Sequence, residues 1–133
     1  MIELVVVIVI LGILAATALP KFIDLSDSAR TAASEGVAAA ATSGFAINYG
    51  ARKASAPGNV QVNGTNAAIC TTAGLAPVMT GGMPTGYDVV AGASTTDCSV
   101  ATNDGQTGTC TVRDTSDVAN TNWHATVTYI CAN

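Results

Sequence analysis

An uninterrupted apolar run near the start of the chain constrains the fold more than any other feature. Residues 4–19 carry no charge, and Glu3 is the only ionisable side chain that precedes Lys21. Because an α-helix rises about 1.5 Å per residue, a helix over this run nearly crosses a hydrocarbon core of about 30 Å. The run therefore fits one of three states: the apolar part of a signal peptide, a membrane anchor, or a helix buried among copies of itself.

A cleaved signal peptide fits the sequence least well. Signal peptides begin with a basic segment, whereas this chain has Glu3 at that place. The small residues from Ala16 to Ala18 do resemble a cleavage site, but the helical pattern continues beyond them. We therefore expect the apolar helix to be retained.

The residues after Lys21 predict an amphipathic continuation of the same helix. Pro20 predicts a kink, because proline lacks the N–H that bonds to the preceding turn, and Pro57-Gly58 predicts the end. A helix of about fifty residues is far longer than the globular mean of about 11–12, so we expect it to pack against something outside its own domain. Apolar and small residues recur every three or four positions on one face: Phe22, Leu25, Ala29, Ala33, Gly36, Ala40, Gly44, Ile47 and Ala51.

The centre of this predicted stripe is made of small residues. Gly36, Ala40 and Gly44 fall four positions apart, which lets another backbone approach the helix closely. For the C-terminal half of the helix, we expect that backbone to belong to the chain's own sheet.

The rest of the chain predicts a small β-rich head. Tyr87–Ala91, Thr109–Arg113 and Ala125–Ile130 contain β-branched residues and are the strand candidates, and Ala67–Leu75 predicts a short helix. The pairs Gly81-Gly82 and Asp104-Gly105 predict turns. The expected fold is α+β, with a small antiparallel sheet across the upper half of the long helix. Its expected segments are an apolar helix (1–22), an amphipathic helix packed on the head (23–56) and the head itself (57–133).

All four cysteines lie in the head, and no two of them have C-x-x-C spacing. The absence of this spacing argues against zinc ribbons, thioredoxin-like motifs and haem attachment. An even number in a small head predicts two disulfides, formed outside the cytoplasm. Four cysteines allow three pairings, which the sequence leaves open. We favour Cys98 with Cys110, closing a loop around Asp104-Gly105, and Cys70 with Cys131.

Composition and charge exclude several classes of function. Charged residues make up only 11% of the chain, against about 25% in soluble domains, and the net charge is −4 with scattered basic residues. Nucleic-acid binding needs a basic patch, so we expect no nucleic-acid partner. His124 is the only histidine, no catalytic triad can be assembled, and the loop aspartates lack EF-hand spacing. We predict no catalytic site, cofactor or metal; Asn63, in an Asn-Gly-Thr sequon, is a candidate glycosylation site.

Glu3 is the one charge within the apolar stretch. A carboxylate costs about 2.5–3.5 kcal/mol at the centre of a bilayer and less near the end of a helix. If it is buried among protein, it needs a basic partner or a proton. In a bundle of identical copies, the positive N-terminus of a neighbour supplies that partner. At a membrane surface, Glu3 would need none.

This N-terminal pattern resembles that of type IV pilins. The resemblance rests on the segment from Ile2 to Ala16, with one glutamate ahead of a long aliphatic run, and on Ala18 to Phe22 after it. Through Asp24, Ala29-Arg30 and the alanine-rich helix, the chain is most similar to the mannose-sensitive haemagglutinin group. The resemblance covers about the first fifty residues, and the head adds only general support.

The resemblance implies roles for individual residues. Glu3 matches the glutamate that pairs with a neighbour's amino terminus during assembly. Gly12 and Pro20 match positions that bracket a stretch often melted out of helix in filaments, and Cys131 resembles the cysteine that closes the family's disulfide-bounded loop. The run would be a transmembrane anchor before assembly and the filament core afterwards, formed by Leu4, Val5, Val6, Val7, Ile8, Val9, Ile10, Leu11, Ile13 and Leu14.

The family's processing differs from this sequence in one respect. A short basic leader ending in glycine is removed by a dedicated peptidase, and the new first residue, usually Phe, is N-methylated four positions ahead of the glutamate. Here Met1 stands only two positions ahead of Glu3. We therefore expect two mature residues to be missing, so that Met1 is internal.

The resemblance implies a structural subunit of an extracellular pilus rather than an enzyme. Its expected partners are identical copies, the bacterial inner membrane before assembly, the leader peptidase and methylase, and an ATPase-driven assembly machinery. The alternative is a major pseudopilin of a type II secretion system, but the weakly charged, Thr-rich head with its four cysteines favours an exposed pilin. The sequence does not choose among adhesion, motility, DNA uptake and biofilm formation.

Overall fold

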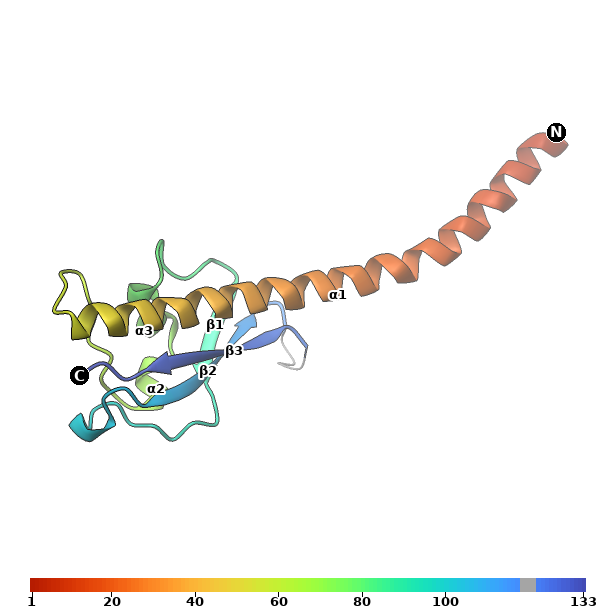
Figure 1. Ribbon diagram of the computed structural model, residues 1–133. Coiled ribbons are helices and arrows are strands. Elements are labelled where there is room, and N and C mark those ends of the chain that lie inside the picture. Colours follow the sequence, from red (N-terminus) through yellow and green to blue (C-terminus); the bar gives the residue numbers. More distant parts are fainter. Residues whose placement is uncertain (118–121) are drawn as a thin grey trace.

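The computed structural model describes residues 1–117 and 122–133. It is dominated by α1, Ile2–Lys53, a single helix of 52 residues whose N-terminal part projects from the head (Figure 1). Where the sequence predicts a kink, α1 stays helical through Pro20 and curves over its N-terminal part. Arg52 and Lys53 lie in its last turn, where their positive charges interact favourably with the negative end of the helix dipole.

The head is built on a three-stranded antiparallel sheet in the order β1-β2-β3. The strands are β1, Tyr87–Ala91, β2, Thr107–Asp114, and β3, His124–Ile130. All three predicted strands are therefore confirmed, with β2 extending past its predicted bounds at both ends. The expected α+β fold, a long N-terminal helix beside a small antiparallel sheet, is also confirmed.

Short helices and turns connect α1 to the sheet. The single helix predicted over residues 67–75 is wrong, because two helices, α2, Asn66–Ile69, and α3, Thr72–Leu75, occupy it. Thr71 separates them in an extended conformation and caps α3 by accepting a hydrogen bond from the Gly74 N–H. The 3₁₀ helices are η1, Ala76–Val78, and η2, Ala101–Asn103.

Residues at the two predicted turns adopt backbone conformations that glycine favours. The φ angles of Gly81, Gly82 and Gly105 are 90°, 76° and 80°. Side chains with a Cβ are strained there, so glycine suits these positions.

The core lies on one face of the sheet, against α1 and the short helices. Alternate residues of β2 and β3, such as Val112, Val127 and Tyr129, are fully buried. Phe45 of α1 packs on Tyr129, with ring centroids 6.2 Å apart. Leu75 of α3 completes this core.

The face of α1 that packs on the sheet is not the predicted stripe. Gly36, Ala40 and Ile47 of that stripe are exposed. The buried row lies beside it and contains polar as well as apolar residues: Ser34, Ala38, Ala41, Phe45 and Asn48. Because small residues occur on every face of this alanine-rich helix, their spacing alone did not single out the buried face.

Two buried polar side chains tie the helix to the head. The Ser34 hydroxyl donates to the Trp123 carbonyl at 3.0 Å. The Asn48 amide donates to the Val60 carbonyl at 2.8 Å and accepts from the Val60 N–H at 2.7 Å. These bonds satisfy the two polar groups, which explains how they replace apolar residues in the interface.

Two disulfides are present, but the favoured pairing is wrong. Cys70 bonds to Cys110, with Cα atoms 5.3 Å apart, and Cys98 bonds to Cys131, with Cα atoms 5.1 Å apart. The sheet register explains the difference, because Cys110 lies opposite Val127 in the middle of β3. Cys131 follows the end of β3, beside the Cys98 loop, whereas Cys110 faces Cys70 at the end of α2.

Candidate assembly surface

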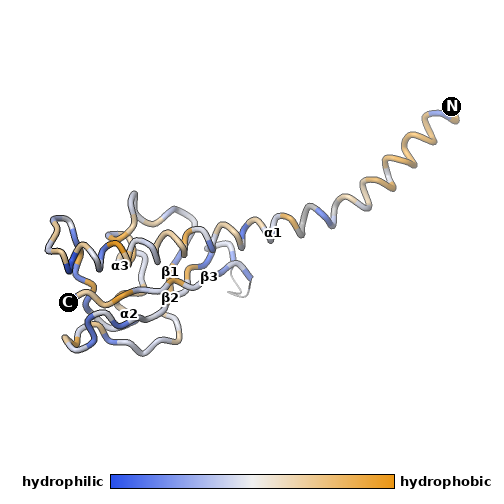
Figure 2. The backbone as a smooth tube through the Cα atoms, viewed as in Figure 1, coloured by the Kyte–Doolittle hydropathy of each residue, from blue (hydrophilic) through white to orange (hydrophobic). Residues whose placement is uncertain are grey.

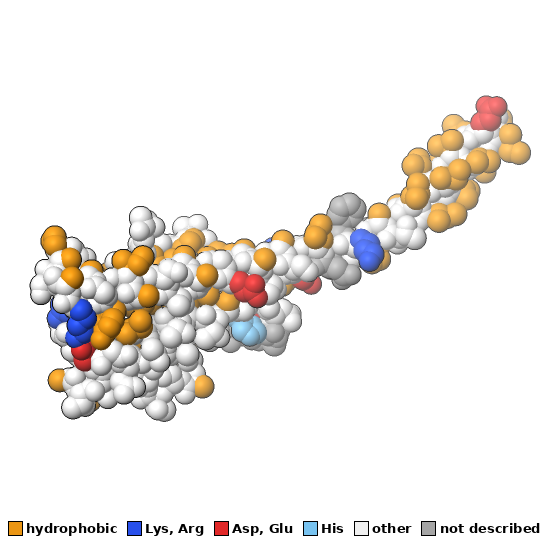
Figure 3. All heavy atoms as spheres, viewed as in Figure 1, with side chains coloured by type: hydrophobic (Ala, Val, Ile, Leu, Met, Phe, Trp, Pro, Cys, Tyr) orange, Lys and Arg blue, Asp and Glu red, His pale blue; other side chains and the backbone are white. Residues whose placement is uncertain are grey.

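The N-terminal end of α1, residues 1–21, forms an apolar arm that the head does not cover. Figure 2 shows the hydrophobic colouring along it, and Figure 3 shows apolar side chains on its visible face. Exposed fractions range from 50% for Val6 to 77% for Ile2 within the helix. Within the described residues, no hydrogen bond or ion pair joins the arm to the head.

The exposed apolar surface of the arm marks it as an interaction surface. Soluble monomers rarely expose contiguous apolar patches beyond a few hundred Å². A helix that is hydrophobic all round is normally buried in a core or in a membrane. The predicted filament-core residues, Leu4 to Leu11 with Ile13 and Leu14, all belong to this surface. Among the described residues, no helix is both long enough and apolar enough to cross a membrane.

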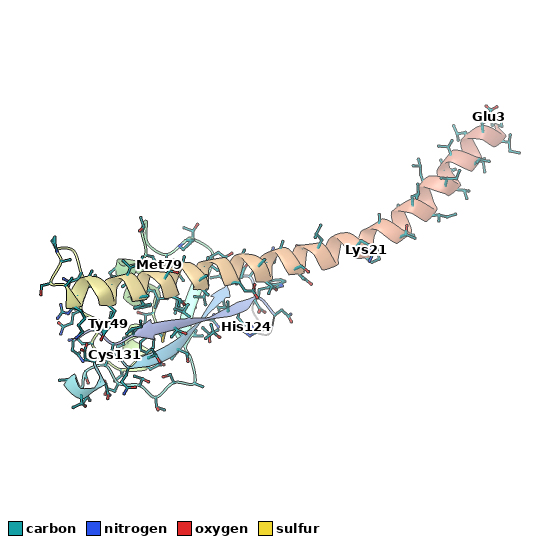
Figure 4. All side chains as sticks on the ribbon, in the orientation of Figure 1. Glu3, Lys21, Tyr49, Met79, His124 and Cys131 are labelled. Carbon is teal, nitrogen blue, oxygen red and sulfur yellow. A yellow bond between two sulfur atoms is a disulfide. The ribbon has the colours of Figure 1, made fainter. Side chains whose placement is uncertain are left out.

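Glu3 lies at the tip of the arm, far from the head (Figure 4). It occupies the first turn of α1, where its negative charge interacts favourably with the positive end of the helix dipole. None of the described basic residues forms an ion pair with it. A partner for Glu3 therefore has to come from outside this subunit, and its pairing with a neighbour stays a prediction.

Gly12 and Pro20 are exposed on the arm. A Cβ built at Gly12 meets no atom within 4 Å. Pro20 lies within the helix, although proline is strongly disfavoured at such positions. The melting of the stretch between these residues in a filament stays a prediction.

Among the described residues, ion pairs join α1 to the head at two places along its length. At one, the Arg30 guanidinium lies 3.2 Å from the Asp114 carboxylate and 4.6 Å from the centre of the Trp123 ring. At the other, the Lys53 ammonium pairs with the Asp104 carboxylate. Sequence reasoning missed both, because the partners are far apart in the chain and no local pattern joins them.

A close backbone approach between these two places also fixes the helix. Gly44 faces the carbonyl of Val78 in η1, and a Cβ at Gly44 would collide with that oxygen. The predicted close approach at this glycine therefore exists, but it is made by η1 rather than by the sheet. At Gly36, by contrast, a Cβ would meet no atom within 4 Å.

Ion pairs shift the pKa values of Asp88, Asp104 and Lys53. Hydrogen bonds from the Arg113 side chain and the Val89 N–H lower the pKa of Asp88. The Lys53 hydrogen bond lowers the pKa of Asp104, and the same bond raises the pKa of Lys53. These shifts accompany charge pairs that hold the fold, so they do not point to catalysis.

The other sequence candidates do not gather into a site. His124 begins β3 and is exposed, and the described residues contain no group of three His, Cys, Asp or Glu that could hold a metal ion. Asn63 is exposed in the loop before α2, and its glycosylation stays a prediction.

A long helix with an exposed apolar arm, joined to a small disulfide-bonded α+β head, is the architecture expected of a type IV pilin. Comparison with known proteins confirms that recognition. The chain is 53% identical over 47 residues to the type IV narrow pilus major component PilA5 of Thermus thermophilus. The match covers 35% of this chain and 40% of the relative, so the chain spans less than half of that protein's length.

No family model matches the chain, and no solved structure matches it. The relative is by its name a pilus component, which agrees with the prediction that this chain is not an enzyme.

Proposed function

We propose that this chain is the structural subunit of an extracellular type IV pilus, built by packing the arms of identical copies into a common core. The exposed arm carries the proposal, because twelve large apolar side chains between Met1 and Leu14 are left without cover from the head. The likeness to a major pilus component supports the same role. No nucleic acid is part of this function.

Burial of the arm in a filament core stabilises the filament relative to an arm exposed to water, but it does not by itself drive the arm out of a membrane. Removing apolar surface from water contributes about 25 cal/mol per Å². The pilin likeness implies that the subunit waits in the bacterial inner membrane, and lipid already keeps such a surface from water. Transfer from lipid to filament therefore gains little, and we propose that an ATPase-driven machinery extrudes the subunits.

Glu3 fixes the axial position of each arm in this proposal. A carboxylate within an apolar core is stable only beside a positive group, and the amino terminus of a neighbouring copy provides one. Gly12 and Pro20 then bracket a stretch of helix that melts on assembly. A leader peptidase and methylase would prepare that amino terminus. The residue-level roles and the processing rest on the pilin likeness.

Electron microscopy of filaments sheared from cells that express the gene tests the proposal, with Glu3→Ala and Glu3→Gln beside the wild type. We expect wild-type filaments that contain this subunit and a sharp loss of filaments with both variants, at equal subunit levels. Abundant filaments from both variants would overturn the proposed role of Glu3, but the proposal that the chain is a pilus subunit would stand. A subunit that stays cell-bound, forms no surface filament and is needed for protein secretion would indicate the pseudopilin instead.

A further inference from the structure

Within the described residues, Lys21 on the arm has no polar partner, whereas the other four basic residues do. Within the described residues, Lys21 forms no hydrogen bond or ion pair, and Figure 4 shows it on the bare part of α1. The remaining four basic residues are engaged: Arg30 with Asp114, Lys53 with Asp104, Arg113 with Asp88, and Arg52 with Asn59 and the Asn133 carbonyl.

Lys21 tolerates this isolation only while water surrounds it. In the proposed filament the arms pack together, and an ammonium group at the base of the arm loses part of its hydration. An ion that is removed from water needs an opposite charge to offset the lost hydration. The assembled state therefore calls for an acidic partner of Lys21.

Two acids farther along α1 border one groove. The groove, about 500 Å³ in volume, lies between α1 and the residues just before β3. Asp27 and Glu35 line it from the helix, and Asn122 and Trp123 line it from the head. Both carboxylates are exposed, and neither forms an ion pair with a described residue. Figure 3 shows an acidic side chain on this part of α1 close to the histidine of the head.

Lys21 cannot reach these acids within its own subunit. Glu35 is fourteen residues farther along the same helix, which is about 21 Å at 1.5 Å per residue. Asp27 is six residues away, about 9 Å along the axis, and projects from a different face of the helix. A pairing of Lys21 with either acid therefore joins two copies of the chain.

We propose that Lys21 of a second copy docks in the groove beside Glu35 and Asp27, which makes this groove an interface between subunits. The proposal rests on the proposed filament and adds a second charge contact to that of Glu3. In parallel copies, contact with the two acids requires an axial offset between about 9 and 21 Å. The charges are complementary, so the contact favours one offset and disfavours those that bring acids together.

Charge reversal tests the contact in the full-length protein. We expect Lys21→Glu to reduce sheared filaments about fivefold or more, since like charges placed together in an interface are strongly unfavourable. Adding Glu35→Lys or Asp27→Lys to that variant should restore at least half of the lost filaments. Asp97→Lys serves as the control for the change of charge, because it alters a partly exposed acid that bonds to Ser99 within one loop of the head, and it should leave filament yield unchanged.

Disulfide cross-linking separates this contact from the filament proposal. Lys21→Cys combined with Glu35→Cys should give intermolecular disulfide ladders on non-reducing gels, whereas either substitution alone should not. If filaments form normally, no disulfide ladders appear and the charge reversals do not change filament yield, the proposed contact is wrong and the filament proposal stands. Ladders without wild-type filaments would support the contact and overturn the filament. If Lys21→Glu reduces filament yield and neither Glu35→Lys nor Asp27→Lys restores it, the proposed contact is wrong. That result would point to anionic lipid as the partner of Lys21.

Discussion

At the scale of single residues, Gly36 and Gly44 show how one sequence pattern has two structural meanings. Both belong to the stripe of small residues predicted along the helix. A Cβ at Gly44 would collide with the Val78 carbonyl, whereas a Cβ at Gly36 would meet nothing within 4 Å. Only Gly44 is therefore required by the fold of the isolated subunit.

This contrast predicts opposite effects of alanine at the two positions. Gly44→Ala should lower the free energy of unfolding by about 1–3 kcal/mol, because η1 has to move away from α1. Gly36→Ala should leave stability unchanged or raise it by up to about 1 kcal/mol, because alanine favours helix. Denaturant unfolding of both variants measures the difference. Equal stability of the two would contradict the close approach at Gly44.

The Asp88–Arg113 pair predicts a loss of stability in acid. Its carboxylate and guanidinium lie 2.8 Å apart, and the hydrogen bond lowers the pKa of Asp88. Because the pKa in the folded state is below the unfolded value of about 3.9, the stabilisation is present above about pH 4 and is lost as the pH falls through the folded value.

The melting temperature followed from pH 6 to pH 2 tests this. Asp88→Asn should lower stability at pH 6 and make the decline in acid shallower than in the wild type. Asp27→Asn is the control, because Asp27 has no ion-pair partner among the described residues. A wild-type slope retained by Asp88→Asn would show that this carboxylate does not contribute to the acid response.

At the scale of elements, the sequence predicted most of the fold because local signals sufficed. β-branched runs indicated all three strands, Pro57-Gly58 indicated the end of α1 within a few residues, and glycine pairs indicated turns. The face of α1 that packs on the head was not predictable in the same way. That face contains Ser34 and Asn48, whose burial depends on bonds to distant carbonyls at Trp123 and Val60.

The disulfide pairing was unpredictable for a related reason. It depends on the register of β2 against β3, which places Cys110 opposite Val127 and leaves Cys131 beyond the end of the ladder. Spacing along the chain carries no information on that register. The number of disulfides followed from the even cysteine count, whereas their connectivity needed the sheet.

The two disulfides should each stabilise the head substantially. They span sequence separations of 40 and 33 residues. For loops of that size the entropy model gives about 3–4 kcal/mol. Replacing Cys98 and Cys131 together with serine should lower the free energy of unfolding by about that amount, and so should the same change at Cys70 and Cys110. Unfolding in denaturant measures the loss, and non-reducing peptide maps check the pairing. A Cys98–Cys110 peptide would contradict it.

At the scale of the whole molecule, the candidate assembly surface was visible in the sequence, but the hold of the head on α1 was not. The arm is defined by one contiguous run, so hydrophobicity alone located it. The Arg30–Asp114 pair links residues 84 positions apart, and the groove beside Glu35 exists only because Asn122 and Trp123, just before β3, lie against α1. The structure thus divides one helix into a part that packs on the head and a part that the head leaves exposed.

That division predicts that the head and the arm can be separated. The described contacts of the head with α1 begin around Asp27 and Arg30, so a chain lacking residues 1–25 should keep its melting temperature within a few degrees. The truncated protein should also be monomeric in water by sedimentation velocity. Full-length protein should self-associate or require detergent, because its arm exposes a helix that is apolar all round.

A matched full-length variant distinguishes apolar burial from chain length as the cause of association. Replacing Val6, Val9 and Ile13 with serine keeps the full chain length and removes three of the exposed apolar side chains. It should weaken association while leaving the melting temperature of the head unchanged, since no described head contact involves the arm. Association that persists in the truncated chain would place the main contact on the head, and a large fall in its melting temperature would show that the arm supports the fold.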